Sequence, residues 1–110
     1  MDKLEKLAFE LISNSGSARS YSFEALKLVK EGKIDQANEK MEIAKEEILK
    51  AHKIQTQLIQ KEANGDRVEV NILLVHAQDH LMSSILANDL IKELIYMQDE
   101  INNIKESKEG

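Results

Sequence analysis

The sequence contains no cysteine and no proline, and only 4% of its residues are aromatic, with no tryptophan among them. The lack of cysteine excludes disulfides, thiolate chemistry and cysteine-ligated zinc sites, and it fits a reducing compartment. The lack of proline means that no position forces a kink in a long helix. Alanine, leucine, isoleucine, lysine and glutamate dominate instead, and these residues favour helix.

A basic stripe and a long apolar run are missing as well. The net charge of −5 and the pI of about 5.2 argue against nucleic acid, or an anionic membrane surface, as the main partner. No apolar run approaches the ~20 residues that span a bilayer, and the first six residues contain no apolar signal core. We therefore expect a cytoplasmic protein whose 110 residues form a single domain over residues 1–110.

Three segments carry apolar residues at steps of three and four, the spacing of a helix with one apolar face. The first runs roughly from Lys3 to Lys30 and ends near Gly32, a residue suited to a left-handed helix cap. The sequence Asn-Ser-Gly-Ser at residues 14–17 interrupts it and predicts either a bend or a short break.

The second segment runs roughly from Asp35 to Ala63 and has a heptad-like seam, typical of helices that pack at a shallow angle. Three seam residues are alanine, which allows a close approach of the partner helix. Gln55 is polar, and polar seam residues often set the register between helices. The seam consists of Ile34, Ala37, Met41, Ala44, Ile48, Ala51, Gln55 and Leu58.

The third segment runs roughly from Val68 to about Ile104, after a capping box predicted from Asp66 and Glu69. The polar residues 105–110 are expected to fray. The stripe expected to face the core consists of Ile72, Val75, Asp79, Met82, Leu86, Leu90, Leu94, Met97, Ile101 and Ile104.

Two short connections make neighbouring helices antiparallel, so we expect an all-α fold, an up-down-up three-helix bundle. More apolar residues lie on the third segment than one core face needs. Excess apolar surface of this kind usually marks an interface, so we also expect self-association, without a copy number. The additional apolar residues are Leu73, Leu74, Leu81, Ile85, Ile91 and Ile95.

Two of the three histidines, His76 and His80, lie four residues apart and therefore share one face of a helix, with Asp79 three residues after His76. Three interpretations fit this spacing. The pair can be surface histidines without a role, a zinc or nickel site, or a phosphoryl-carrying nucleophile with a second imidazole that orients or protonates. A metal site is disfavoured because no third histidine is near, and the spacing alone leaves the other two interpretations open.

Asp79 is unusual because it falls on the apolar stripe, between Val75 and Met82. An ionised carboxylate in apolar surroundings is costly unless it is paired or bound to a cation. Either the stripe is locally open and Asp79 is solvated, or several copies pack this helix around an axis where their Asp79 side chains meet. A hard cation with carboxylate and water ligands would offset the repulsion at such an axis.

The run His76-Ala77-Gln78-Asp79-His80-Leu81-Met82 resembles the active-site signature of the lactose/cellobiose-specific IIA proteins of the bacterial phosphoenolpyruvate-dependent sugar phosphotransferase system. The resemblance covers the chain from about residue 4 to about residue 94, and it favours the phosphoryl-carrier interpretation of His76. Further matching elements are Gly16-Ser17-Ala18-Arg19-Ser20, Glu24-Ala25-Leu26, Ala51-His52 and Gln55-Thr56.

The resemblance implies a cytoplasmic phosphocarrier whose three-helix protomers assemble into a nine-helix homotrimer. His76 would accept a phosphoryl group from phospho-HPr and pass it to a cysteine of a IIB component, so contact with the membrane would be indirect, through the IIB/IIC transporter. Asp79 would bind Mg²⁺, one ion per trimer at the axis. His80 and Gln78 would lie near the phosphoryl group.

The resemblance does not identify the sugar, because specificity lies largely in IIB and IIC. We expect a cellobiose-like or chitobiose-like β-diglucoside, with lactose second. His52 and Arg19 match the family in sequence and are assigned no role beyond structure. The alternative function is a non-catalytic helical interaction module with an incidental histidine pair, and a metal-storage or electron-transfer bundle would need more ligands than the chain offers.

Overall fold

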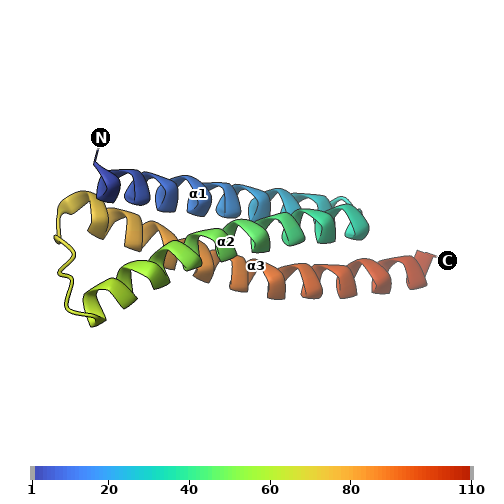
Figure 1. Cartoon of the computed structure of the whole chain (residues 1–110). Helices are drawn as coiled ribbons and strands as arrows, with labels where there is room; N and C mark the ends of the chain where they lie inside the picture. The colour runs from blue at the N-terminus through green and yellow to red at the C-terminus, as the bar shows by residue number, and fades with distance from the viewer. Residues whose placement is uncertain (1, 110) are drawn as a thin grey trace.

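Three helices make up nearly all of the computed structural model, which describes residues 2–109 (Figure 1). α1 spans Lys3–Lys30, α2 spans Ile34–Ala63 and α3 spans Ile72–Glu109. α1 and α3 run in the same direction and α2 runs in the opposite one, which confirms the expected all-α, up-down-up arrangement. Within residues 2–109, no helix combines the length and the hydropathy that a membrane crossing requires.

α1 continues through residues 14–17, so the break considered for this segment does not form. Ser15 faces the core and is completely buried, in line with the buried Leu11, Ala18 and Ser22. The hydroxyl of Ser22 donates to the carbonyl oxygen of Ala18 at 2.8 Å and so remains satisfied inside the core. Packing of this continuous buried face outweighs the low helix propensity of serine and glycine.

Glycines end both α1 and α2. Gly32 and Gly65 have φ angles of +80° and +92°, the left-handed conformation in which glycine avoids the strain of a Cβ. At both ends the glycine and the next residue donate back to the last helical turn, the pattern of a Schellman motif. The four bonds are Gly32 N to Val29 O and Lys33 N to Leu28 O, both 3.0 Å, and Gly65 N to Glu62 O and Asp66 N to Lys61 O, both 3.1 Å.

The beginning of α3 corrects a prediction. The capping box of Asp66 and Glu69 does not form, because the backbone N–H of Asp66 already belongs to the end of α2. Asn71 caps the helix instead, and its Oδ1 accepts a hydrogen bond from the backbone N–H of Leu74 at 2.8 Å. Asparagine is among the best residues for this position.

Both limits of α3 therefore differ from the predicted Val68 and Ile104. The helix begins at Ile72 and continues to Glu109, so residues 105–109, expected to fray, extend it. Lysine and glutamate are good helix formers, and a lysine in the last turn complements the helix dipole. Figure 1 shows the final turns of α3 extending past the turn between α1 and α2.

α1 packs against both other helices, whereas α2 and α3 contact each other more sparingly. Figure 1 shows α2 diverging from α1 and α3 toward its C-terminal end. The alanines of the α2 seam, Ala37, Ala44 and Ala51, are completely buried, which confirms the predicted close approach. Leu11 of α1 and Leu81 of α3 are the largest completely buried side chains of the core.

The core-facing side of α3 is not the predicted one. Leu81 and Ile91, placed outside the predicted stripe, are buried, whereas Leu86 on the stripe is 60% exposed. The pattern misleads because α3 carries apolar residues on two faces, and periodicity does not tell which face meets α1. All the apolar residues of the predicted stripe form an exposed surface, here called the α3 stripe: Ile72, Val75, Met82, Leu86, Leu90, Leu94, Met97, Ile101 and Ile104.

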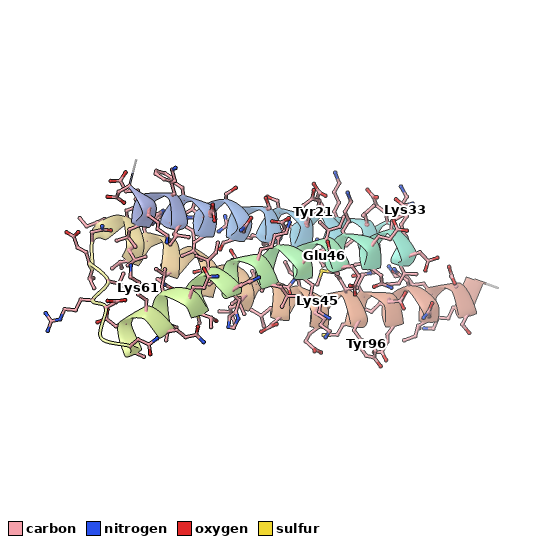
Figure 2. The ribbon with its side chains drawn as sticks, viewed as in Figure 1. Tyr21, Lys33, Lys45, Glu46, Lys61 and Tyr96 are labelled. Atoms are coloured by element: carbon pink, nitrogen blue, oxygen red, sulfur yellow. The ribbon has the colours of Figure 1, made fainter. Side chains whose placement is uncertain are left out.

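The other outer surfaces differ in character. Charged side chains such as Glu46 and Lys61 cover the outside of α2 (Figure 2). Lys40 lies over the ring of Tyr21 on α1, with its ammonium 5.4 Å from the ring centroid.

A continuous apolar surface on a small protein usually marks a contact with another protein. The α3 stripe is therefore the surface on which assembly must be considered.

Candidate functional site

His76 and His80 lie on consecutive turns near the start of α3, as predicted. Their ring centroids are 4.6 Å apart and the ring planes are inclined at 78°, an edge-to-face contact. His76 is exposed, while His80 is half-buried. The pair thus combines an accessible imidazole with a neighbouring ring that restricts how it turns.

Asp79 is exposed and lies on the α3 stripe. Its stripe neighbours Val75 and Met82 are 56% and 55% exposed, so within one protomer the carboxylate is solvated and its apolar position carries little cost. The expected penalty for an ionised group in apolar surroundings therefore arises only when another molecule covers the stripe.

A metal ion at Asp79 would need ligands from outside one protomer. Among the described residues of the single chain, no group of three or more histidine, aspartate or glutamate side chains is arranged to hold an ion. Carboxylate oxygen nonetheless suits a hard cation such as Mg²⁺. The donor chemistry fits, provided that further copies bring their own Asp79 to the same point.

Gln78 faces α2 and not His76. Its Oε1 accepts a hydrogen bond of 2.7 Å from Nε2 of Gln55, the polar residue of the α2 seam. Residues two apart on a helix point about 200° apart, so Gln78 and His76 of one chain do not face each other. The structure therefore brings His76 and His80 together and leaves Gln78 on the other side of Asp79.

Gln55 is the residue of this region that the sequence alone did not connect to the site. Its Nε2 also lies 3.9 Å from Sδ of Met82, the last residue of the signature run. The available signal was a polar residue at a seam position of α2, which indicated register but not its partner. His52 and Arg19 are exposed on α2 and α1.

Known proteins resemble the chain over most of its length. The family model of the lactose/cellobiose-specific IIA subunit of the PTS system matches residues 6–99. The lichenan-specific phosphotransferase enzyme IIA component of Bacillus subtilis is 40% identical over 100 residues, covering 91% of both chains.

Solved structures agree in fold. The PTS cellobiose-specific enzyme IIA of Bacillus anthracis superimposes with a TM-score of 0.91 at 47% identity, covering 94% of both chains. The IIA(chitobiose) of Escherichia coli, solved in complex with HPr, gives a TM-score of 0.80 at 40% identity over 93% of this chain and 99% of that one. With a family match over residues 6–99 and these similarities, the chain belongs to the lactose/cellobiose-specific IIA family of the phosphotransferase system.

Proposed function

We propose that His76 is the residue through which this IIA component carries a phosphoryl group. As a member of this family, the chain is a phosphocarrier in sugar uptake, with HPr as donor and a IIB component as acceptor. The observation that supports His76 is its exposure on α3, in edge-to-face contact with the ring of His80.

The proposed transfer makes modest demands on the protein. An unprotonated imidazole nitrogen of His76 attacks phosphorus, a nitrogen–phosphorus bond forms, and the bond between phosphorus and the donor atom breaks. In a second displacement a cysteine thiolate of IIB attacks the phosphorus, a sulfur–phosphorus bond forms, and the nitrogen–phosphorus bond to His76 breaks, which restores the free imidazole. Positioning is the main contribution of the protein in phosphoryl transfer, and an exposed side chain on a helix allows donor and acceptor to approach in line.

Phosphorylation with phosphoenolpyruvate, Enzyme I and HPr tests this assignment. We expect one acid-labile phosphate per chain, absent from His76→Ala and retained by His52→Ala, which removes an exposed histidine from another helix. Mass spectrometry locates the group. A label on His80 or His52 contradicts the role of His76, and a chain that takes up no phosphate at all supports the alternative of a non-catalytic interaction module.

We further propose that three copies assemble through the α3 stripe. The support is the length of this exposed apolar surface, which runs along α3 from Ile72 to Ile104. Around a threefold axis each stripe is covered by the stripes of the other two copies. Sedimentation equilibrium at micromolar concentration should give three times the 12.5 kDa mass of the protomer, and a monomer or dimer mass contradicts the proposal.

Such an assembly explains how both His80 and Gln78 can lie near the phosphoryl group. His76 and Gln78 flank Asp79 on opposite sides of the helix, so they lie at opposite edges of the α3 stripe. In a ring of three helices, the edge with His76 faces the edge of the next copy that bears Gln78. His80 then neighbours the phosphoryl group within its own chain, and Gln78 approaches from the adjacent one.

The same assembly would bring three Asp79 side chains to the axis. We propose that one Mg²⁺ per trimer binds there, with carboxylate and water oxygens as ligands. The ion would neutralise carboxylates that the covered stripe removes from water.

For the sugar, we propose a cellobiose-like or chitobiose-like β-diglucoside, with lactose second, and the cytoplasm as the location. The similar IIA proteins named above are described as specific for lichenan, cellobiose and chitobiose, so similarity among IIA chains alone does not single out one sugar. Transfer from the phosphorylated chain to IIB components of known specificity would identify the transporter that it serves.

A further inference from the structure

Gln55 is the only amide on the otherwise apolar seam of α2, and it reaches across to the helix that carries the candidate site. It is half-buried, and its Nε2 donates to Oε1 of Gln78 at 2.7 Å. Where α2 and α3 otherwise touch sparingly, this bond joins two side chains that are 23 positions apart in the chain.

The neighbouring Met82 favours an orientation of Gln55 in which its amino group, and not its carbonyl oxygen, points toward α3. Its thioether sulfur, 3.9 Å from Nε2 of Gln55, accepts hydrogen bonds weakly and donates none. An amino group is therefore the favourable neighbour for it. With two N–H donors, Gln55 serves both the sulfur of Met82 and the oxygen of Gln78.

This arrangement determines what Gln78 presents to its surroundings. A carboxamide has one carbonyl oxygen and two N–H donors. Since Gln55 engages the oxygen of Gln78, this bond leaves both N–H donors of Gln78 to an acceptor other than Gln55. A phosphoryl group carries close to two negative charges and three acceptor oxygens, for which N–H donors are complementary and a carbonyl oxygen is repulsive.

We propose that Gln55 is a positioning residue, which holds the amide of Gln78 so that its N–H groups point to the phosphoryl group on His76 of an adjacent copy. The inference rests on the proposed function of His76 and on the proposed trimer. Gln55 acts through Gln78 and does not itself touch the phosphoryl group. If Gln55 only set the register between α2 and α3, the effect of replacing it on transfer would not depend on Gln78.

The test is a double-mutant cycle on single-turnover transfer from phospho-HPr, with Gln55→Met, Gln78→Met and the double variant. Both single variants should slow transfer about ten- to a hundredfold, the loss expected for one hydrogen bond to a charged group. The double variant should be no slower than Gln78→Met alone. Methionine is chosen because it suits an apolar seam. Thermal melting and sedimentation of the variants should show the same folding and assembly as the wild type.

A variant that replaces the donor at position 55 by an acceptor sharpens the test. In Gln55→Glu, an ionised carboxylate only accepts, so it should turn the Gln78 amide around and slow transfer more than Gln55→Met does. Gln57→Glu adds the same charge at an exposed position of the same helix and should transfer at the wild-type rate. Phosphorus NMR of the phosphohistidine should show the same displaced signal in Gln55→Met and Gln78→Met.

Several results overturn the inference while leaving the proposed function intact. Transfer by Gln55→Met at the wild-type rate, or an equal slowing in the Gln78→Met background, shows that Gln55 does not act through Gln78. A Gln55→Met chain that fails to assemble shows that the residue serves packing. A wild-type chain that is never phosphorylated on His76 refutes the proposed function itself, and the inference with it.

Discussion

Single backbone N–H groups decide where the helices of this protein begin and end. The two glycine caps use the N–H of the residue that follows each glycine, and at the end of α2 that residue is Asp66. The carboxylate of Asp66 is thereby placed at a helix end and not at a helix start. Asn71 then becomes the first side chain able to cap α3.

The identity of this cap can be checked by paired substitutions. Asn71→Ala removes the side-chain acceptor for the N–H of Leu74 and should lower the free energy of unfolding by about 1 kcal/mol. Asp66→Ala leaves the backbone hydrogen bond at the end of α2 in place. This substitution should change the free energy of unfolding by less than about 0.5 kcal/mol. Urea unfolding measures both, and a larger loss for Asp66→Ala would restore the capping box predicted from the sequence.

Among the site residues, the spacing of His76 and His80 was sufficient to predict that they meet, because a regular helix fixes the geometry of residues four apart. The partner of Gln78 was not predictable in the same way. Gln55 belongs to another helix, and the relative rotation of two helices depends on packing along their whole length. Metal binding by Asp79 remains a prediction, since it depends on other copies of the chain.

At the scale of elements, α1 stays helical through Gly16, because packing of its buried face outweighs the low helix propensity of glycine. A Cβ added to Gly16 would have no atom within 4 Å, and its backbone is helical. Gly16→Ala should therefore raise the free energy of unfolding by about 0.5–1 kcal/mol. Gly32→Ala is the matched control, because its φ of +80° strains any side chain and should lower stability by about 1–2 kcal/mol. Equal effects of the two substitutions would contradict a continuous α1.

The helices themselves, and the core-facing side of α2, could be predicted from the sequence. Ala37, Ala44, Ala51 and Leu58 of the α2 seam are all buried, since one apolar stripe leaves a helix only one way to face the core. α3 offers two apolar faces, so its rotation could not be derived from spacing. In the structure Leu81 belongs to a buried cluster with Ala8 of α1 and Ala51 of α2, and Ile91 belongs to one with Ala25 of α1 and Ala37 of α2. The rotation of α3 therefore depends on the small side chains that both other helices present to it.

The two faces of α3 should respond differently to the same substitution. Leu81→Ala empties a completely buried position and should destabilise the protomer by about 2–5 kcal/mol. Leu86→Ala, on the exposed stripe, should leave the protomer fold intact and raise the concentration at which the assembly dissociates. Urea unfolding and sedimentation, each over a range of protein concentrations, separate the two effects. A Leu86→Ala variant that unfolds like Leu81→Ala would contradict the rotation of α3.

At the scale of the whole molecule, the elongated protomer measures 63 × 24 × 19 Å and exposes its apolar stripe along α3, its longest helix. A bundle of this shape buries a modest core for its length, and the proposed association along the long axis would add to that burial. Assembly would also change the environment of Asp79, from solvated in the protomer to enclosed among apolar side chains.

That change leads to a prediction about Asp79→Leu. Removing a carboxylate from covered apolar surroundings, where only a cation balances it, is often neutral or stabilising by about 1–4 kcal/mol. The variant should therefore remain a trimer, melt at the same or a higher temperature, and no longer respond to EDTA. The wild type should melt at a lower temperature with EDTA, because an ion that binds only the folded trimer stabilises it by mass action.

Asp89→Leu provides the control, since it removes the same charge from an exposed position of the same helix that is not one of the stripe positions. This variant should keep the response to EDTA, which separates the loss of a ligand from the loss of a negative charge. A wild type indifferent to EDTA, together with a strongly destabilised Asp79→Leu, would mean that Asp79 stays solvated in the assembly. The carboxylate would then lie at an open part of the interface, and repulsion from a phosphorylated His76, three residues away, would be screened by water and not by an ion.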